Sequence, residues 1–143
     1  MTETTISLDL IEKTSATAMI KHGAAPWIAA EVAKAIRKAE ATGNLICGLY
    51  YLESYCAQLT SGRVKGTVEP IVTKPKPASV LVDARFGFAQ PAFARGLSTA
   101  LETAHDMGTA SFAVAHSHTC TSLGYFTEQI ADAGLIGLGF TNA

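Results

Sequence analysis

The sequence predicts an α/β protein, in which an N-terminal helical array precedes a small layered βαβαβ sheet. Three observations support this fold class: apolar residues recur at helical spacing through residues 1–62, residues 63–78 are rich in proline and glycine, and strand and helix patterns alternate over residues 79–143. Such alternation is typical of βαβ units. We therefore expect a helical segment (1–62), a linker loop (63–78) and the start of an α/β cofactor and substrate domain (79–143).

Capping residues divide the helical segment. Ser7 predicts the N-cap of a helix that runs to about Ile20 and stops at Gly23. Pro26 begins a second helix, because a proline at the first helical position loses no hydrogen bond. Gly43 ends this helix. A third apolar stripe at helical spacing stops at Ser61-Gly62 and consists of Leu49, Leu52, Cys56 and Leu59.

The second half of the chain predicts three strands, at residues 79–83, 111–114 and 135–140. Prolines exclude a central strand from the linker, in which Ile71-Val72 can pair only briefly. One helix begins at Pro91 and closes at Gly108, and another runs from near Ser122 to Gly134. The core seam of the first is predicted as Ala94, Leu97, Leu101 and Ala104. A strand at 135–140 would leave an uncovered sheet edge, so we expect a partner or a longer chain to cover it.

The composition excludes several classes of function. A formal net charge of -1 and scattered basic residues argue against binding to nucleic acid or to an acidic membrane. Residues 1–5 lack the basic and apolar regions of a secretory signal, and no apolar run reaches the length of a membrane span. Three cysteines favour reduced thiols over a disulfide framework. We expect a cytoplasmic protein.

The stretch from Val114 to Phe126 carries the most reactive side chains. His116, His118 and Cys120 occupy alternate positions, and alternate residues of a strand share one face. His118 is our candidate general acid/base, because the pKa of histidine lies close to working pH. The alternative is a histidine that bonds a loop carbonyl. His116 has either an orienting catalytic role or a structural one.

The same trio has a second interpretation, a zinc site. Imidazole and thiolate are the preferred ligands of zinc, and Cys47 would complete a tetrahedral set with His116, His118 and Cys120 if the helical array folds over the strand end.

Several short motifs, in order, carry a resemblance to a known family. They are Ala30-Glu31-Val32-Ala33, the run from Tyr55 to Arg63, Val82-Asp83, the helix end Ala104–Gly108, Ser117-His118, Gly124-Tyr125 and Gly139–Asn142. Through them the chain resembles the N-terminal part of the malate/L-lactate dehydrogenase-like family of NAD(P)-dependent 2-hydroxyacid oxidoreductases, which is distinct from the Rossmann-fold lactate and malate dehydrogenases.

The resemblance implies NAD or NADP as cofactor and a small 2-oxo or 2-hydroxy acid, or a cyclic imine, as substrate. Family members are more than twice as long as this chain, and the missing portion carries most of the cofactor contacts. The chain is therefore expected to be incomplete relative to the family fold. We expect it to act as a homodimer or in assembly with a C-terminal polypeptide, and to be inactive alone.

The resemblance also implies roles for particular residues. Where the family shows Ser-His-Gly this chain reads Ile46-Cys47-Gly48, and Tyr51 stands at the position of an arginine that holds the substrate carboxylate. In the family pattern Asn-Ser-x-His, His116 takes the asparagine position and Thr119 the final histidine, with His118 one place earlier.

Proton transfer is thus expected of His118, supported by His116. The expected substrate contacts are Cys47, Tyr51, Thr119, Thr141 and Asn142. Loss of the family's histidine and arginine keeps one alternative open, a non-catalytic module that dimerises or binds a partner.

Overall fold

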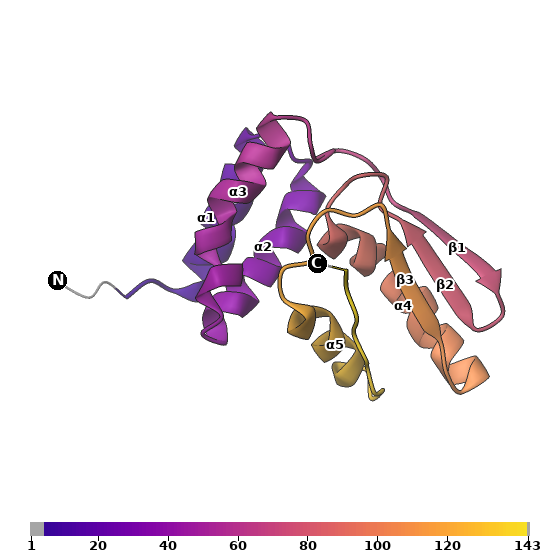
Figure 1. Cartoon of the computed structure of the whole chain (residues 1–143). Coiled ribbons are helices and arrows are strands. Elements are labelled where there is room, and N and C mark those ends of the chain that lie inside the picture. Colours follow the sequence, from indigo (N-terminus) through magenta and orange to yellow (C-terminus); the bar gives the residue numbers. More distant parts are fainter. Residues whose placement is uncertain (1–4, 143) are drawn as a thin grey trace.

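A computed structural model describes residues 5–142 of the chain. Residues 1–4, which carry most of the expectation about a secretory signal, and Ala143 lie outside the described residues. The helical array and the α/β part lie side by side (Figure 1). In chain order the elements are α1 (Leu8–Lys21), α2 (Pro26–Ala41), the short 3-10 helix η1 (Leu45–Cys47), α3 (Leu49–Thr60), β1 (Ile71–Lys76), β2 (Ser79–Asp83), α4 (Ala89–Met107), β3 (Ser111–Ala115) and α5 (Leu123–Asp132).

The helical array forms as its capping residues predict. The Ser7 hydroxyl accepts a hydrogen bond of 3.2 Å from the backbone N–H of Leu10, which satisfies one free donor at the start of α1. Gly43 ends the second helix at φ 74°, a conformation that glycine adopts without strain. The core of the array comes from apolar faces of all three helices and includes Met19, Ile28, Val32, Ile36, Tyr55 and Leu59.

The sheet has three strands in the order β1-β2-β3. β2 and β3 run parallel, with Val82 opposite Val114, and β1 pairs antiparallel with β2. The strand pairing expected at Ile71-Val72 is present and extends to Lys76, so the loop expected over residues 63–78 is interrupted by β1. Pro75 is compatible with β1 because β1 is an edge strand, where a missing N–H costs no ladder bond. The α/β class is confirmed.

The face of α4 that packs on the sheet differs from the predicted seam. Phe93, Gly96, Ala100 and Thr103 are buried, whereas Leu97 is only half-buried. A Cβ on Gly96 would lie 2.4 Å from Cγ2 of Val82, so glycine lets the helix approach the sheet closely. The helix face that packs on the sheet is thus set by a glycine that allows close approach, which apolar periodicity does not indicate.

The predicted strand at residues 135–140 is also wrong. Residues 135–142 form no strand, and the segment runs back along α5 (Figure 1). None of the described helices combines the length and the apolarity that a membrane crossing needs.

Candidate functional site

The carboxyl ends of β2 and β3 are held together beyond the strands themselves. The N–H of Ala84 donates to the carbonyl of Ala115 (2.9 Å), and the N–H of Phe86 donates to the carbonyl of His116 (2.7 Å). Further along, the N–H of His118 donates to the carbonyl of Gly87 (2.8 Å). Ligands of open α/β sheets bind outside the carboxyl ends of parallel strands. This edge is therefore the natural place for a site.

The two histidines of this edge would share a face only if β3 continued through them, and it does not. β3 ends at Ala115, and His116 has a left-handed backbone at φ 49°, which breaks the strand alternation. The exposed ring of His116 turns back over the sheet end, where its Nδ1 lies 3.0 Å from Oδ1 of Asp83. It also stacks against Phe86, with the ring centroids 5.5 Å apart.

Asp83 is an anchor for the strained β2–α4 loop. Its Oδ1 accepts a 2.8 Å hydrogen bond from the backbone N–H of Arg85, and this bond, with a smaller contribution from His116, lowers the pKa of the carboxyl group. Arg85 and Phe86 both have positive φ, at 52° and 64°. Left-handed backbone at non-glycine residues costs free energy and tends to cluster at functional sites.

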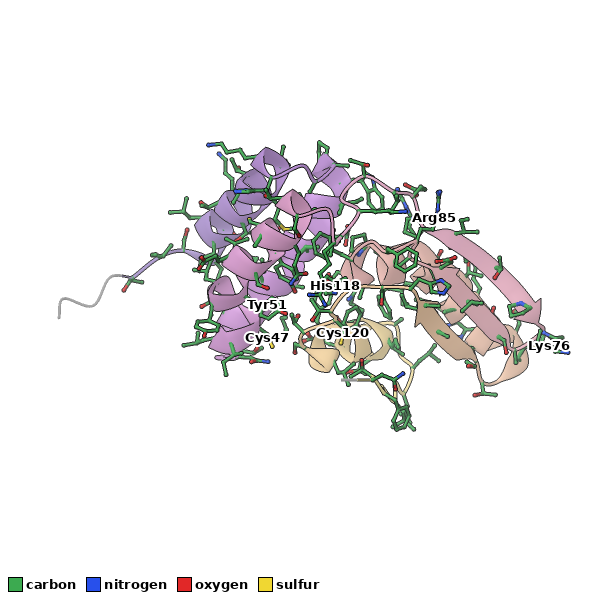
Figure 2. All side chains as sticks on the ribbon, turned by 45° about the horizontal axis from the view of Figure 1, so that its top comes forward. Cys47, Tyr51, Lys76, Arg85, His118 and Cys120 are labelled. Carbon is green, nitrogen blue, oxygen red and sulfur yellow. The ribbon has the colours of Figure 1, made fainter. Side chains whose placement is uncertain are left out.

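His118 faces the helical array. It forms a parallel bridge with Phe88, and paired residues of neighbouring strands project to the same side. The ring of Phe88 contacts Tyr55 of α3 edge-on, with centroids 5.4 Å apart, so His118 lies on the side that α3 covers. Figure 2 shows His118 in this region together with Cys47, Tyr51 and Cys120, away from Arg85 and Lys76.

The His118 ring is half-buried and incompletely bonded. Its Nε2 is buried and has no hydrogen-bond partner among the described residues. Burial, and to a lesser degree the charge of Arg63, lowers the pKa of His118 below its ordinary value of 6.5. The lowered pKa favours the neutral imidazole at pH 7.

A buried polar network ties α3 and α4 to the β3–α5 loop. The Tyr55 hydroxyl lies 3.3 Å from Oγ1 of Thr121, to which it donates. Nε2 of Gln90 donates to the Tyr55 hydroxyl and to the carbonyl of Cys120, both at 3.3 Å. Burial raises the pKa of Tyr55 far above its ordinary value, so its hydroxyl stays protonated. The network fixes the loop that follows His118.

Sequence reasoning missed Gln90. Its side chain is fully buried, and Oε1 has no partner among the described residues. The available signal was a single amide in the otherwise apolar run Phe88-Ala89-Gln90-Pro91-Ala92-Phe93. A buried amide requires hydrogen-bond partners, which marks such a residue for attention.

The remaining predicted residues lie around the same junction. Cys47 is in η1, with a free and partly buried thiol, and the Tyr51 ring lies 5.0 Å from that of Tyr55. Oγ1 of Thr141 lies 3.6 Å from Sγ of Cys120 and donates to the carbonyl of Asn142. Thr119 is half-buried in the loop. Their roles in substrate binding stay predictions.

The geometry of the described residues gives no support to the alternative of a zinc site. Within residues 5–142, no group of three or more His, Cys, Asp or Glu side chains is placed to hold a metal ion. The trio diverges because His116 turns to Asp83, His118 faces α3, and Cys120 contacts Thr141.

A cavity lies beside this junction. It measures about 640 Å³ and is lined by residues of α2, α5 and the segment after α5. Ser122 belongs to its lining, but His118 and Gln90 do not. A 2.6 Å ion pair between Lys38 and Glu128 spans the two helices that form it.

Comparisons with known proteins match nearly the whole chain. A sequence profile described as malate/L-lactate dehydrogenase matches residues 6–143. A Delta(1)-pyrroline-2-carboxylate/Delta(1)-piperideine-2-carboxylate reductase of Pseudomonas syringae pv. tomato is 34% identical over 124 residues, which are 87% of this chain and 36% of that protein. A (2R)-3-sulfolactate dehydrogenase (NADP(+)) of Chromohalobacter salexigens is 35% identical over 138 residues, 96% of this chain and 41% of that protein.

Solved structures show the same fold. A malate dehydrogenase from Entamoeba histolytica superposes with a TM-score of 0.84 at 21% identity, covering 92% of this chain and 37% of that one. A malate dehydrogenase from Pyrococcus horikoshii OT3 gives 0.83 at 23% identity, with coverage of 90% and 37%. This chain thus spans between 36% and 41% of the length of these relatives.

Proposed function

The chain belongs to the malate/L-lactate dehydrogenase family, and on that premise we propose that it is the N-terminal portion of an NAD(P)-dependent oxidoreductase that acts on a small 2-oxo or 2-hydroxy acid or on a cyclic imino acid. The names of the two relatives support this substrate class. In pyrroline-2-carboxylate and in sulfolactate, the carbon that exchanges hydride carries a carboxylate. Because the chain covers only 36% and 41% of these relatives, activity is expected to need the part that it does not match.

One observation carries the proposal: the neutral imidazole of His118, with a buried and unpartnered Nε2, at the carboxyl end of β3. A neutral imidazole accepts a proton. As hydride leaves C2 of a 2-hydroxy acid, Nε2 of His118 accepts the hydroxyl proton, and in the reverse reduction it returns that proton to oxygen or to an imine nitrogen. Proton transfer of this kind contributes about 10²- to 10⁴-fold to a rate.

The nicotinamide cofactor, when bound, supplies or accepts the hydride. The β3–α5 loop fits the reacting end of such a group, because the buried Nε2 of His118 and Oε1 of Gln90 lack partners among the described residues. We assign His118 and Thr119 to the reacting end of the cofactor. The phosphate-binding platform is assigned to the unmatched portion of the relatives.

On the substrate side we assign Cys47, Tyr51, Thr141 and Asn142, which surround the junction of α3 with the loop. None of these side chains carries a positive charge at pH 7. Arg63 follows α3, and its charge reaches His118. We therefore assign to Arg63 the attraction of the substrate carboxylate, in place of the family's arginine, which is Tyr51 here.

The test is a chimera in which this chain is followed by the unmatched portion of the sulfolactate dehydrogenase, assayed for NADP⁺ reduction with (2R)-3-sulfolactate. His118→Gln is expected to lower kcat by about 10²-fold or more. His105→Gln is the matched control, because His105 is exposed near the end of α4. Equal kcat in the two variants, or no NADP⁺ binding by the chimera, would remove the proposal.

The replacement of the family's histidine and arginine by Cys47 and Tyr51 favours one other candidate, a non-catalytic dimerising module. Sedimentation of the isolated chain separates the two. Tight self-association, together with no turnover in the chimera, supports the module.

A further inference from the structure

The carboxyl edge of the sheet carries a second group of exposed side chains, which the proposed function does not use. Phe86, in the β2–α4 loop, is 59% exposed. Its ring lies against that of His116, with the centroids 5.5 Å apart and the ring planes inclined by 32°. The imidazole of His116 is itself exposed. Two aromatic rings from different loops thus form one open surface.

Basic groups surround this aromatic surface. Nζ of Lys65, in the segment between α3 and β1, lies 5.6 Å from the centre of the Phe86 ring. Arg85 directly precedes Phe86 and is exposed. Neither Lys65 nor Arg85 has a carboxylate partner among the described residues. Both charges are therefore available to a ligand.

The carboxylate of Asp83 is already engaged. Its Oδ1 accepts from the N–H of Arg85 at 2.8 Å and lies 3.0 Å from Nδ1 of His116. Because Nδ1 faces Asp83, the other ring nitrogen, Nε2, points away from the carboxylate. One carboxylate beside Lys65 and Arg85 leaves a net positive charge on this surface even when His116 is neutral.

The backbone beneath these side chains is fixed. The N–H of Lys65 donates to the carbonyl of Phe86 (2.9 Å), and the N–H of Phe86 donates to that of His116 (2.7 Å). Arg85, Phe86 and His116 all have left-handed backbone, at φ 52°, 64° and 49°. Such conformations cost free energy in residues other than glycine and occur at ligand clamps. The rings and the cations are thus held in place before a ligand arrives.

We propose that this aromatic and cationic surface is a binding site for a free nucleotide, that is, a nucleoside that carries one or two phosphates. The base lies on the exposed rings of Phe86 and His116, since stacking on aromatic side chains accepts any base. The phosphate pairs with Arg85 and Lys65. Two cations suit one or two phosphates and not a polyanion, which agrees with the scattered basic residues and the net charge of -1 of the whole chain.

The nucleotide site is separate from the candidate site of the proposed function. His118 faces α3, and Figure 2 shows Arg85 away from it. The β3–α5 loop nevertheless carries both His116 and His118, and the carbonyl of His116 accepts from Phe86. A nucleotide bound at Phe86 and His116 would therefore restrain the loop that carries the candidate base.

The test titrates the full chain with AMP, adenosine and inorganic phosphate, and follows binding by calorimetry and by amide chemical shifts. AMP is expected to bind at least about tenfold more tightly than adenosine or phosphate, because it engages the rings and the cations at once. The amide signals of residues 85–87 and 116 should move. The affinity should fall as the salt concentration rises from about 50 to about 200 mM, as expected for phosphate contacts.

Two charge-removing variants identify the phosphate contacts. Arg85→Gln and Lys65→Gln should each weaken AMP binding by about tenfold, because each removes one charge-assisted contact. Both side chains are exposed, so the fold should be unaffected. Lys76→Gln is the matched control, because Lys76 is an exposed lysine that pairs with Ser79 at the opposite end of β1 from Asp83 (Figure 2). Phe86→Leu should weaken the binding of AMP but not that of phosphate.

Each outcome decides. No AMP binding, or equal affinities of the Arg85→Gln and Lys76→Gln variants, overturns the nucleotide site. Phosphate that binds as tightly as AMP also overturns it, because the rings then contribute nothing. Adenosine that binds as tightly as AMP does so too, because the cations then contribute nothing. None of these measurements depends on turnover, so the nucleotide site and the proposed function are refuted by different results.

Discussion

Removing the Tyr55 hydroxyl tests whether the buried network holds the β3–α5 loop. Tyr55→Phe keeps the ring contacts with Phe88 and Tyr51 but deletes the hydrogen bonds to Thr121 and from Gln90, both 3.3 Å long. The Thr121 hydroxyl and one N–H of the Gln90 amide still donate to the carbonyl of Cys120, whereas the other N–H of Gln90 loses its acceptor. At about 0.5–1.5 kcal/mol net for each of the two neutral hydrogen bonds, the free energy of unfolding should fall by about 1–3 kcal/mol.

Urea denaturation measures this change as a lower midpoint at constant m-value. With an unfolding entropy of about 2.1 cal/mol/K per residue over 143 residues, the Tm should fall by about 3–10 °C. Tyr50→Phe is the matched control on the same helix, because Tyr50 is 79% exposed and should change stability by less than about 0.5 kcal/mol. The NMR signals of the His118 ring should shift only in the Tyr55 variant. Equal stability of the two variants, with unmoved His118 signals, would refute the network.

Four further predictions concern charge, packing and capping. Arg63→Gln should raise the pKa of His118 measured by NMR titration, since the charge of Arg63 helps to lower it. Because the folded state disfavours protonated His118, the free energy of unfolding should rise with pH up to about 6.5. The His118→Gln variant should show a smaller rise. An unchanged dependence on pH would contradict the argument that burial lowers the pKa of His118. Gly96→Ala should destabilise by about 1–2 kcal/mol in calorimetry, because overpacking against Val82 outweighs the better helix propensity. Ser7→Ala should cost about 1 kcal/mol in urea denaturation, and no loss would mean that the cap contributes nothing.

Local rules were reliable for the helices. Ser7, Pro26 and Gly108 mark helix ends because capping, a fixed φ and a left-handed C-terminal residue depend on a few adjacent residues. The same rules failed where strand formation depends on a partner. The segment 71–76 pairs with β2 despite its proline, whereas the more apolar segment 135–140 finds nothing to pair with among the described residues.

The candidate site shows the same division. The order of the motifs predicted the family, and residues 116–120 were predicted to carry reactive side chains. Strand alternation, if it continued through them, would place His116 and His118 on one face. A single left-handed residue, His116 at φ 49°, separates them. The role of Gln90 was little indicated by the sequence, because the sequence does not distinguish a buried amide side chain from an exposed one.

The sequence by itself determined the α/β class, the helices and the family, because capping, periodicity and motif order are written in neighbouring residues. Only the tertiary structure decided which way each histidine turns and which polar groups meet. Tyr55 reaches Thr121 across 66 positions and Gln90 reaches Cys120 across 30. Such contacts form because helices and strands bury their apolar faces together, and that packing brings distant polar groups within hydrogen-bonding distance.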